Sequence, residues 1–138
     1  MNKTRYSRVA LTAVGLTLIV IVLGAWVRLT DAGLGCPDWP GCYGELTWPK
    51  TEDQVLAANT RWAERPVETG KAIREMVHRY VAGLLILLVS YLTISAWRRR
   101  RHDPNHPVIL PSVILGWILF QAALGMWTVT LLLKPAIV

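Results

Sequence analysis

Three long runs of hydrophobic residues, separated by polar segments, dominate the chain. Residues 9–29 and 77–97 carry charge only near their ends, at Arg28 and Arg79, and residues 108–133 carry no charge at all. A helix of about 21 residues covers roughly 30 Å, which is the thickness of the hydrocarbon core of a bilayer. The pattern therefore predicts three transmembrane helices.

The composition agrees with this pattern. Of the 138 residues, 53% are hydrophobic and only 17% are charged, and the mean hydropathy is +0.36. These values argue against disorder, and too few residues lie outside the three runs to form a soluble enzyme with a large core. We expect an all-α membrane protein in which residues 1–138 form a single transmembrane domain.

The first run has a signal peptide as its alternative interpretation, because basic residues precede it. The apolar region of a signal peptide is usually about 7–15 residues long and is followed by a small-residue cleavage site. Residues 9–29 form a longer run, and no Ala-x-Ala site follows it. We therefore interpret it as a retained first helix.

Basic residues in the short polar segments predict the orientation. Residues 1–8 hold three basic side chains, and the loop 98–107 opens with four consecutive arginines, whereas acidic and basic residues offset each other in residues 30–72. Since short cytoplasmic segments are enriched in Lys and Arg, residues 98–107 form a cytoplasmic loop and residues 30–72 an outer loop. The net charge of +6 then reflects topology, so we expect membrane lipid and not nucleic acid as a partner.

The outer loop and the helix ends carry further local signals. Residues 52–65 are rich in helix formers and predict a short helix lying at the membrane surface. The second helix is expected to begin ahead of the membrane, near Gly70, because residues 71–80 contain no helix breaker. Pro111 falls in the first turn of the third helix, where a missing N–H is tolerated.

A carboxylate and an imidazole lie three residues apart, at Glu75 and His78, where the second helix enters the membrane. On a helix this spacing places both side chains on one face. An ionisable group at that depth is costly unless it faces a protein interior, a cavity or a cofactor, and a membrane-embedded histidine is a natural axial ligand for heme iron. The spacing leaves heme ligation and a hydrogen bond to a neighbouring helix or lipid head group equally open.

Two arginines lie near the outer ends of the first and second helices, at Arg28 and Arg79. Their ordinary role is to extend the charged head to the membrane interface while the aliphatic stem stays buried. The alternative is a clamp for the propionate carboxylates of a heme, which a guanidinium matches in geometry.

The only two cysteines, Cys36 and Cys42, lie in the outer loop. An oxidising compartment favours a disulfide between them, either as a structural staple or as a redox-active pair. Zinc is not expected, because two thiols are too few ligands and the outer loop contains no histidine. His102 and His106 are separated by Pro104, so we interpret them as solvated loop residues and expect no other metal site.

Three separated blocks carry a resemblance to a known family. Residues 24–44 (GAWVRLTDAGLGCPDWPGCYG) resemble the end of the first helix and the outer loop of the heme A synthase family. Residues 75–84 (EMVHRYVAGL) are similar to its second-helix motif, and residues 121–130 (QAALGMWTVT) to its third helix. The blocks occur in the family's order and cover most of the chain.

This resemblance implies a fold of eight transmembrane helices in two four-helix halves, each half with a pair of histidine ligands. It implies conversion of heme o to heme a, in which a ring methyl group is oxidised to a formyl group in successive oxygenation steps. His78 would be an axial ligand of the substrate heme, and Glu75 the carboxylate needed for turnover. Cys36 and Cys42 would form a disulfide that takes part in electron transfer or heme handover. A heme b cofactor is expected in the other half, and heme o synthase and cytochrome oxidase assembly factors are the expected partners.

The length departs from the family pattern, because three helices are present where eight are expected. The second axial ligand of this half would belong to a fourth helix, and His102 and His106 are predicted to lie on the opposite side of the membrane from His78. We therefore expect the 138-residue chain to be inactive alone. The alternative function is a non-enzymatic heme protein, in which His78 from each of two chains binds heme across a homodimer for heme transport or electron transfer.

Overall fold

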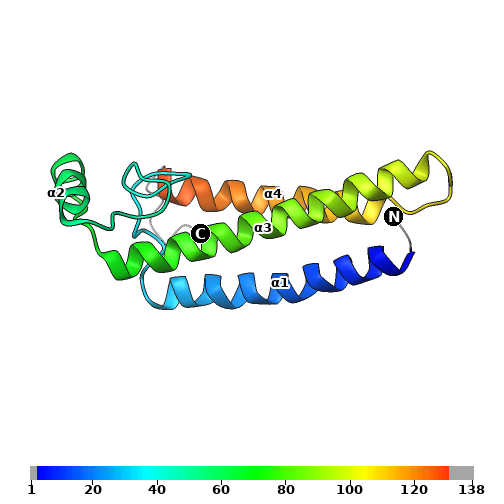
Figure 1. Cartoon of the computed structure of the whole chain (residues 1–138), viewed down its shortest axis with the longest axis horizontal. Coiled ribbons are helices and arrows are strands. Elements are labelled where there is room, and N and C mark those ends of the chain that lie inside the picture. Colours follow the sequence, from blue (N-terminus) through cyan, green and yellow to red (C-terminus); the bar gives the residue numbers. More distant parts are fainter. Residues whose placement is uncertain (1–2, 131–138) are drawn as a thin grey trace. The chain divides into compact units, whose positions relative to one another are not determined.

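The computed structural model describes residues 3–130, whose regular structure is helical. Four helices follow one another along the chain: α1 (Lys3–Leu29), α2 (Glu52–Arg61), α3 (Thr69–Arg100) and α4 (Ile109–Thr130) (Figure 1). Helices α1, α3 and α4 are long and apolar enough to cross a membrane, whereas α2 has only 10 residues. The predicted all-α class with three transmembrane helices is confirmed.

The first two long helices extend beyond the predicted apolar runs into polar sequence. Helix α1 already begins at Lys3, and α3 begins at Thr69, next to the expected Gly70, and continues to Arg100. These added turns contain Lys, Arg and Met, which are good helix formers. The charged groups of Lys and Arg can lie in water, so these turns need not lie in the apolar core of the membrane. Helix α4 begins at Ile109, and residues 131–133 of the predicted third helix lie outside the described residues.

The short helix predicted in the outer loop is present as α2. Thr51 Oγ1 accepts a hydrogen bond from the Gln54 backbone N–H at 3.3 Å, and Gln54 Oε1 accepts one from the Thr51 N–H at 3.2 Å. This reciprocal pair is a capping box, which satisfies N–H groups that the first helical turn leaves without partners. The helix ends at Arg61, before the expected residue 65, and Pro66 disfavours helical conformation in the residue that precedes it.

The chain divides into two compact units, and each long helix contributes residues to both. Unit 1 contains Met1–Ile21 and Val81–Ala122, and unit 2 contains Val22–Tyr80 and Ala123–Val138. The single transmembrane domain expected from the sequence stays a prediction. The outer loop belongs entirely to unit 2, so the candidate site is built there.

Unit 1 is held together by an apolar cluster and two side-chain hydrogen bonds. The buried members of the cluster are Ala13, Leu85, Val89 and Leu92. Thr93 Oγ1 donates to Pro111 O at 3.1 Å, and Trp97 Nε1 donates to Ser112 Oγ at 3.0 Å. These bonds join α3 to α4, and in membranes such polar contacts between helices supplement packing by small and apolar side chains.

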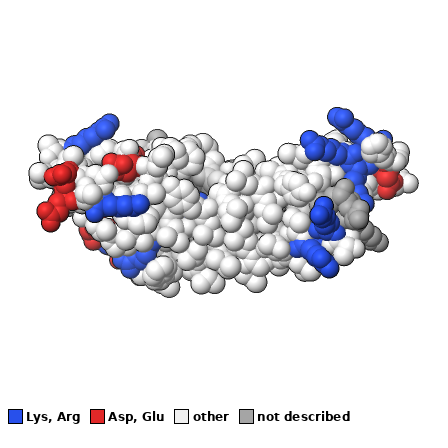
Figure 2. Space-filling view, viewed as in Figure 1, with Lys and Arg blue, Asp and Glu red and all other residues white. Residues whose placement is uncertain are grey.

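Within residues 3–130, the long helices carry no charged residue between Arg8 and Arg28 of α1, between Arg79 and Arg98 of α3, or in α4. Figure 2 shows the Lys, Arg, Asp and Glu side chains on the visible face separated by a stretch of uncharged surface. Many large apolar side chains of the long helices are exposed, including Leu18, Leu87 and Trp117. A hydrocarbon environment solvates such side chains, which agrees with membrane insertion.

Candidate functional site

Cys36 and Cys42 form a disulfide, with their Cα atoms 4.8 Å apart and both side chains fully buried. We call residues 36–42 the cysteine ring. Gly35 allows the chain to approach α3 directly, since a Cβ atom at this position would lie 2.9 Å from the backbone carbonyl carbon of Lys71. The predicted pairing is confirmed, and the ring lies against the first turn of α3.

The Asp38 side chain, which belongs to the cysteine ring, accepts two backbone hydrogen bonds from the residues that follow the ring. Its Oδ1 accepts the Tyr43 backbone N–H at 2.6 Å, and its Oδ2 accepts the Gly44 N–H at 2.7 Å. Both donor residues have positive φ angles, 56° for Tyr43 and 78° for Gly44, so their N–H groups point back toward one carboxylate. Short acidic side chains commonly cap backbone N–H groups in turns, and this was the signal in the CPDWPGC segment that could have identified Asp38.

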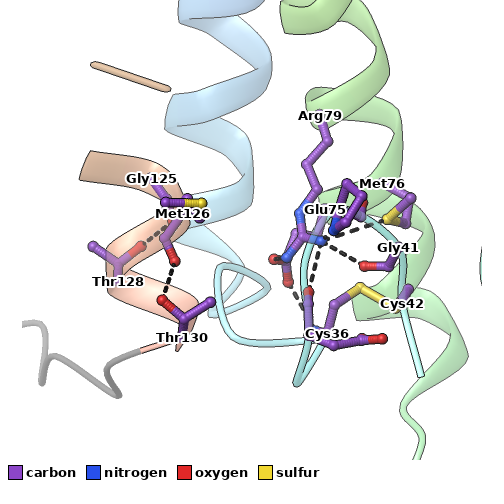
Figure 3. Close-up of polar contacts among 12 residues, drawn as sticks. Cys36, Gly41, Cys42, Glu75, Met76, Arg79, Gly125, Met126, Thr128 and Thr130 are labelled. Carbon is purple, nitrogen blue, oxygen red and sulfur yellow. Dashed lines mark hydrogen bonds and ion pairs between the residues drawn. A yellow bond between two sulfur atoms is a disulfide. The ribbon is translucent and has the colours of Figure 1, made fainter. Parts of the chain in front are cut away.

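Glu75 lies on α3 and is 4% exposed. Its Oε2 accepts the backbone N–H of Cys36 at 2.9 Å, and its Oε1 forms an ion pair with Arg79. Figure 3 shows both side chains extending from α3 toward the cysteine ring. The structure therefore brings the predicted carboxylate into direct contact with the backbone of the predicted disulfide.

Arg79 lies one helical turn after Glu75 and binds main-chain carbonyls of the ring. Its Nη1 donates to Asp38 O at 2.9 Å and to Gly41 O at 2.6 Å, while its Nη2 pairs with Glu75 (Figure 3). The Arg79 side chain is 13% exposed. Sequence reasoning placed this side chain at the membrane interface or on a heme propionate, and it did not anticipate a bond to the ring.

His78 lies between these two residues in the sequence and contacts a different element. Its imidazole packs against Gly24 of α1, where an added Cβ atom would stand 3.1 Å from His78 Cε1. The Nδ1 atom is buried and has no hydrogen-bond partner among residues 3–130. Buried polar atoms are nearly always paired, so this nitrogen needs a partner beyond the described residues.

Arg28 lies near the end of α1, and its side chain is exposed. Within residues 3–130 its guanidinium forms no ion pair or side-chain hydrogen bond. The structure therefore leaves Arg28 available for an external anion and does not place it with Glu75 or Arg79.

Aromatic residues of the outer loop pack around the ring. Trp62 stands edge-on to Tyr43 with ring centroids 5.6 Å apart, and Trp48 packs on the same buried cluster. The Tyr43 hydroxyl donates to Pro66 O at 3.2 Å. Burial raises the pKa of the Tyr43 phenol above its ordinary value, so it stays a neutral donor at physiological pH.

The sequence can now be placed among known proteins. Residues 7–138 match the cytochrome oxidase assembly protein family. The chain belongs to this family. With its three apolar helices, this cytochrome oxidase assembly family member is a multi-pass membrane protein.

Relatives of this family member carry the name heme A synthase, as the three sequence blocks suggested. It is 48% identical over 122 residues to heme A synthase of Shewanella oneidensis, a match that covers 88% of this chain and 36% of the relative. It is 37% identical over 116 residues to heme A synthase of Halalkalibacterium halodurans, which covers 83% of this chain and 33% of the relative. The chain thus spans about a third of the length of the curated relatives it matches. No solved structure matches it.

Proposed function

We propose that this chain is the N-terminal part of a heme A synthase, which oxidises a ring methyl group of heme o to the formyl group of heme a for cytochrome oxidase assembly. The 48% identity to the Shewanella oneidensis heme A synthase, over 88% of the chain, carries this proposal. The substrate-heme segment of the family is the part that the chain resembles, since it contains the cysteine loop and the histidine motif.

His78 is the proposed axial ligand of the substrate heme. The close approach of the imidazole to Gly24 fits that role, and the buried Nδ1, which has no partner among residues 3–130, leaves this histidine without a structural hydrogen bond at that atom. A histidine bound to a metal generally has its second ring nitrogen held by a further partner, which orients the ring. Gly24 supplies space on one side of the imidazole, and it leaves the ring free of side-chain contact from that position of α1.

Glu75 is the proposed catalytic carboxylate. It lies one helical turn from His78, and its negative charge is fixed by the Cys36 N–H and by Arg79. A charge held in advance in a buried site stabilises developing positive charge without the cost of reorganising solvent. The substrate supplies the iron centre, and this chain supplies the ligand and the oriented carboxylate.

The remaining roles rest on two grounds: charge and depth for the arginines, and the family resemblance for the heme b cofactor, the disulfide and the partners. We propose that Arg28 binds a heme propionate, for which its unpaired guanidinium is suited, and Arg79 is a weaker candidate for the same role. A heme b cofactor belongs to the other half of the family fold and has no proposed ligand in this chain. The Cys36–Cys42 disulfide is proposed to act in electron transfer or heme handover, with heme o synthase and cytochrome oxidase assembly factors as partners.

Heme product analysis tests this function. Because the 138 residues alone are expected to be inactive, they are joined in frame to the remaining part of the Shewanella oneidensis heme A synthase. This fusion is expressed with a source of heme o in a host that makes no heme a, and the extracted hemes are separated and identified by mass spectrometry. Appearance of a formyl-bearing heme, absent from cells with an empty vector, is the expected result. Heme bound to the purified protein without any formyl product would contradict the proposal and favour the homodimeric, non-enzymatic heme protein.

Replacing Gly24 with alanine should weaken heme binding several-fold. The new Cβ would lie 3.1 Å from His78 Cε1, which is closer than ordinary van der Waals contact, so the imidazole must shift. Heme titration followed by visible absorbance measures the change. Gly15→Ala is the matched control, because a Cβ there meets nothing within 4 Å. Equal affinities of the two variants would show that Gly24 does not position the ligand.

We further propose that the protein lies in the inner membrane with the cysteine ring on the outer face. In intact cells treated with a reductant, Cys36 and Cys42 should react with a membrane-impermeant maleimide. A His102→Cys reporter, made with both native cysteines changed to serine, should react only after the cells are opened. Labelling of the reporter in intact cells would reverse the proposed topology.

A further inference from the structure

Two neighbouring side chains of α3 hold opposite parts of the cysteine ring. Glu75 binds the first residue of the ring, through the Cys36 N–H, at 2.9 Å. Arg79 binds its middle and its end, through Asp38 O at 2.9 Å and Gly41 O at 2.6 Å. Because the two side chains also pair with each other, the ring is fastened at three points to one helical turn.

This arrangement fixes the separation of the two sulfur-bearing residues independently of the disulfide itself. Cys36 is itself anchored through its backbone N–H, and Cys42 follows the anchored Gly41. Holding two reacting groups at a fixed separation raises their effective concentration for each other. Anchors of this kind shift the thiol–disulfide equilibrium toward the disulfide, in proportion to how much better they bind the closed ring than the open one.

We propose that Arg79 is a positioning residue that couples the redox state of the Cys36–Cys42 pair to the placement of Glu75. In the oxidised state the closed ring offers its carbonyls to Arg79 and its Cys36 N–H to Glu75. In the reduced state the ring is free to open, the Cys36 N–H and the two carbonyls separate, and the Glu75–Arg79 pair loses its contacts with the loop.

The coupling is reciprocal by thermodynamic linkage. Reduction by a dithiol transfers two electrons and two protons to the pair, which breaks the S–S bond, gives two thiols and leaves the dithiol as its own disulfide. If docking of Arg79 on the ring raises the equilibrium constant for disulfide formation by a given factor, formation of the disulfide raises the equilibrium constant for docking of Arg79 by the same factor. The redox part of this inference stands apart from heme chemistry, and only its consequence for turnover rests on the proposed function.

The chemistry of the contacts explains why an arginine occupies the position. A planar guanidinium presents several donors in fixed directions, so it can bind two carbonyls and one carboxylate together. A lysine offers a compact charge that cannot span these acceptors with the same geometry. Charge-assisted hydrogen bonds in a buried setting are among the stronger polar contacts, and Arg79 is largely buried here.

A redox titration of the 138-residue chain in lipid nanodiscs tests the coupling. The protein is equilibrated in buffers with varying ratios of reduced to oxidised dithiothreitol and quenched with acid, and its free thiols are counted by maleimide labelling and mass spectrometry. Arg79→Gln should shift the equilibrium about tenfold toward the thiols, which is about 30 mV for a two-electron couple. Arg79→Lys should give a smaller shift in the same direction.

Arg74→Gln is the matched control, because Arg74 lies on the same helix and its contacts, with Gly70 O at 2.9 Å and with the Trp26 ring at 5.8 Å, do not involve the cysteine ring. It should titrate like the unmodified chain. Helix content measured by circular dichroism shows whether each variant is folded, and Arg79→Lys carries the test if Arg79→Gln is not. Identical equilibrium constants for the unmodified chain and the folded Arg79 variant would overturn the proposal.

A double-mutant cycle tests whether Glu75 and Arg79 act together on the ring or independently of each other. Glu75→Gln keeps an oxygen acceptor for the Cys36 N–H and removes the charge that pairs with Arg79. If the pair acts as a unit, the double variant should titrate like Arg79→Gln alone. Fully additive shifts would contradict the coupling to Glu75. Because no heme is present, a negative result in this titration is distinguishable from failure of the proposed heme oxidation.

Discussion

Replacing His78 with alanine should abolish stable binding of heme by the purified protein. The proposed axial bond is then lost, and the adjoining Gly24 offers no replacement ligand. Changes to groups that only orient a metal ligand cost about 10–100-fold in affinity, so we expect loss of the ligand itself to cost more than about 100-fold. Absorbance titration with ferric heme, in detergent or nanodiscs, measures the effect.

Two further variants distinguish loss of the ligand from collapse of the site. His78→Met retains a side chain that can bind iron, so it should keep heme with a displaced Soret band. His106→Ala removes a loop histidine whose ring stands edge-on to Tyr6, at 6.5 Å between centroids, and should bind heme normally. Unchanged heme retention in purified His78→Ala would eliminate this residue as the ligand.

The transmembrane helices were predictable because their signal is local and summed over many residues. Each apolar run must satisfy its backbone hydrogen bonds within the bilayer, which leaves helix as the available structure. The helix ends were less predictable, since α1 and α3 continue through polar turns that hydropathy alone assigns to loops. The absence of a helix breaker in residues 71–80 was the local sign that α3 starts ahead of its apolar run.

Residue types and spacing indicated most of the candidate residues, whose roles stay predictions, while their contacts were not predictable. Glu75, His78 and both cysteines were recognised from chemistry and spacing, and the disulfide is present. The bonds of Arg79 to Asp38 and Gly41 join residues 41 and 38 positions apart, so no periodicity in the sequence reports them. They depend on how a loop with several glycines docks on a helix, which is a tertiary property.

Because the cysteine ring docks on α3, Glu75 and His78 contact different neighbours despite their three-residue spacing. The three-residue interval predicted that both side chains lie on one face of the helix. In the structure Glu75 faces the cysteine ring and His78 faces Gly24, one turn apart on α3. Side chains 60° apart around a helix, as this interval gives, can contact different neighbours and still border one space.

Changing Glu75 to glutamine should leave heme binding nearly intact and stop its oxidation. Glutamine keeps the volume of the side chain and an oxygen for the Cys36 N–H, so the local structure is retained. It removes the fixed negative charge, and loss of one such electrostatic contact commonly lowers turnover about 10²–10³-fold. Heme affinity and the yield of formyl heme, measured on the same preparation, should therefore separate.

Alanine at the same position makes a less specific test, for a reason visible in the contacts. Glu75→Ala leaves Arg79 largely buried without its carboxylate partner, and breaking a buried ion pair in this way costs about 3–5 kcal/mol. Any loss of activity in that variant could arise from the missing carboxylate or from lower stability of the fold, so the two causes would not be separated. We still expect Glu75→Ala to bind heme. Normal formyl heme production by Glu75→Gln would show that the carboxylate serves the cysteine ring alone, as an anchor and not as a catalytic group.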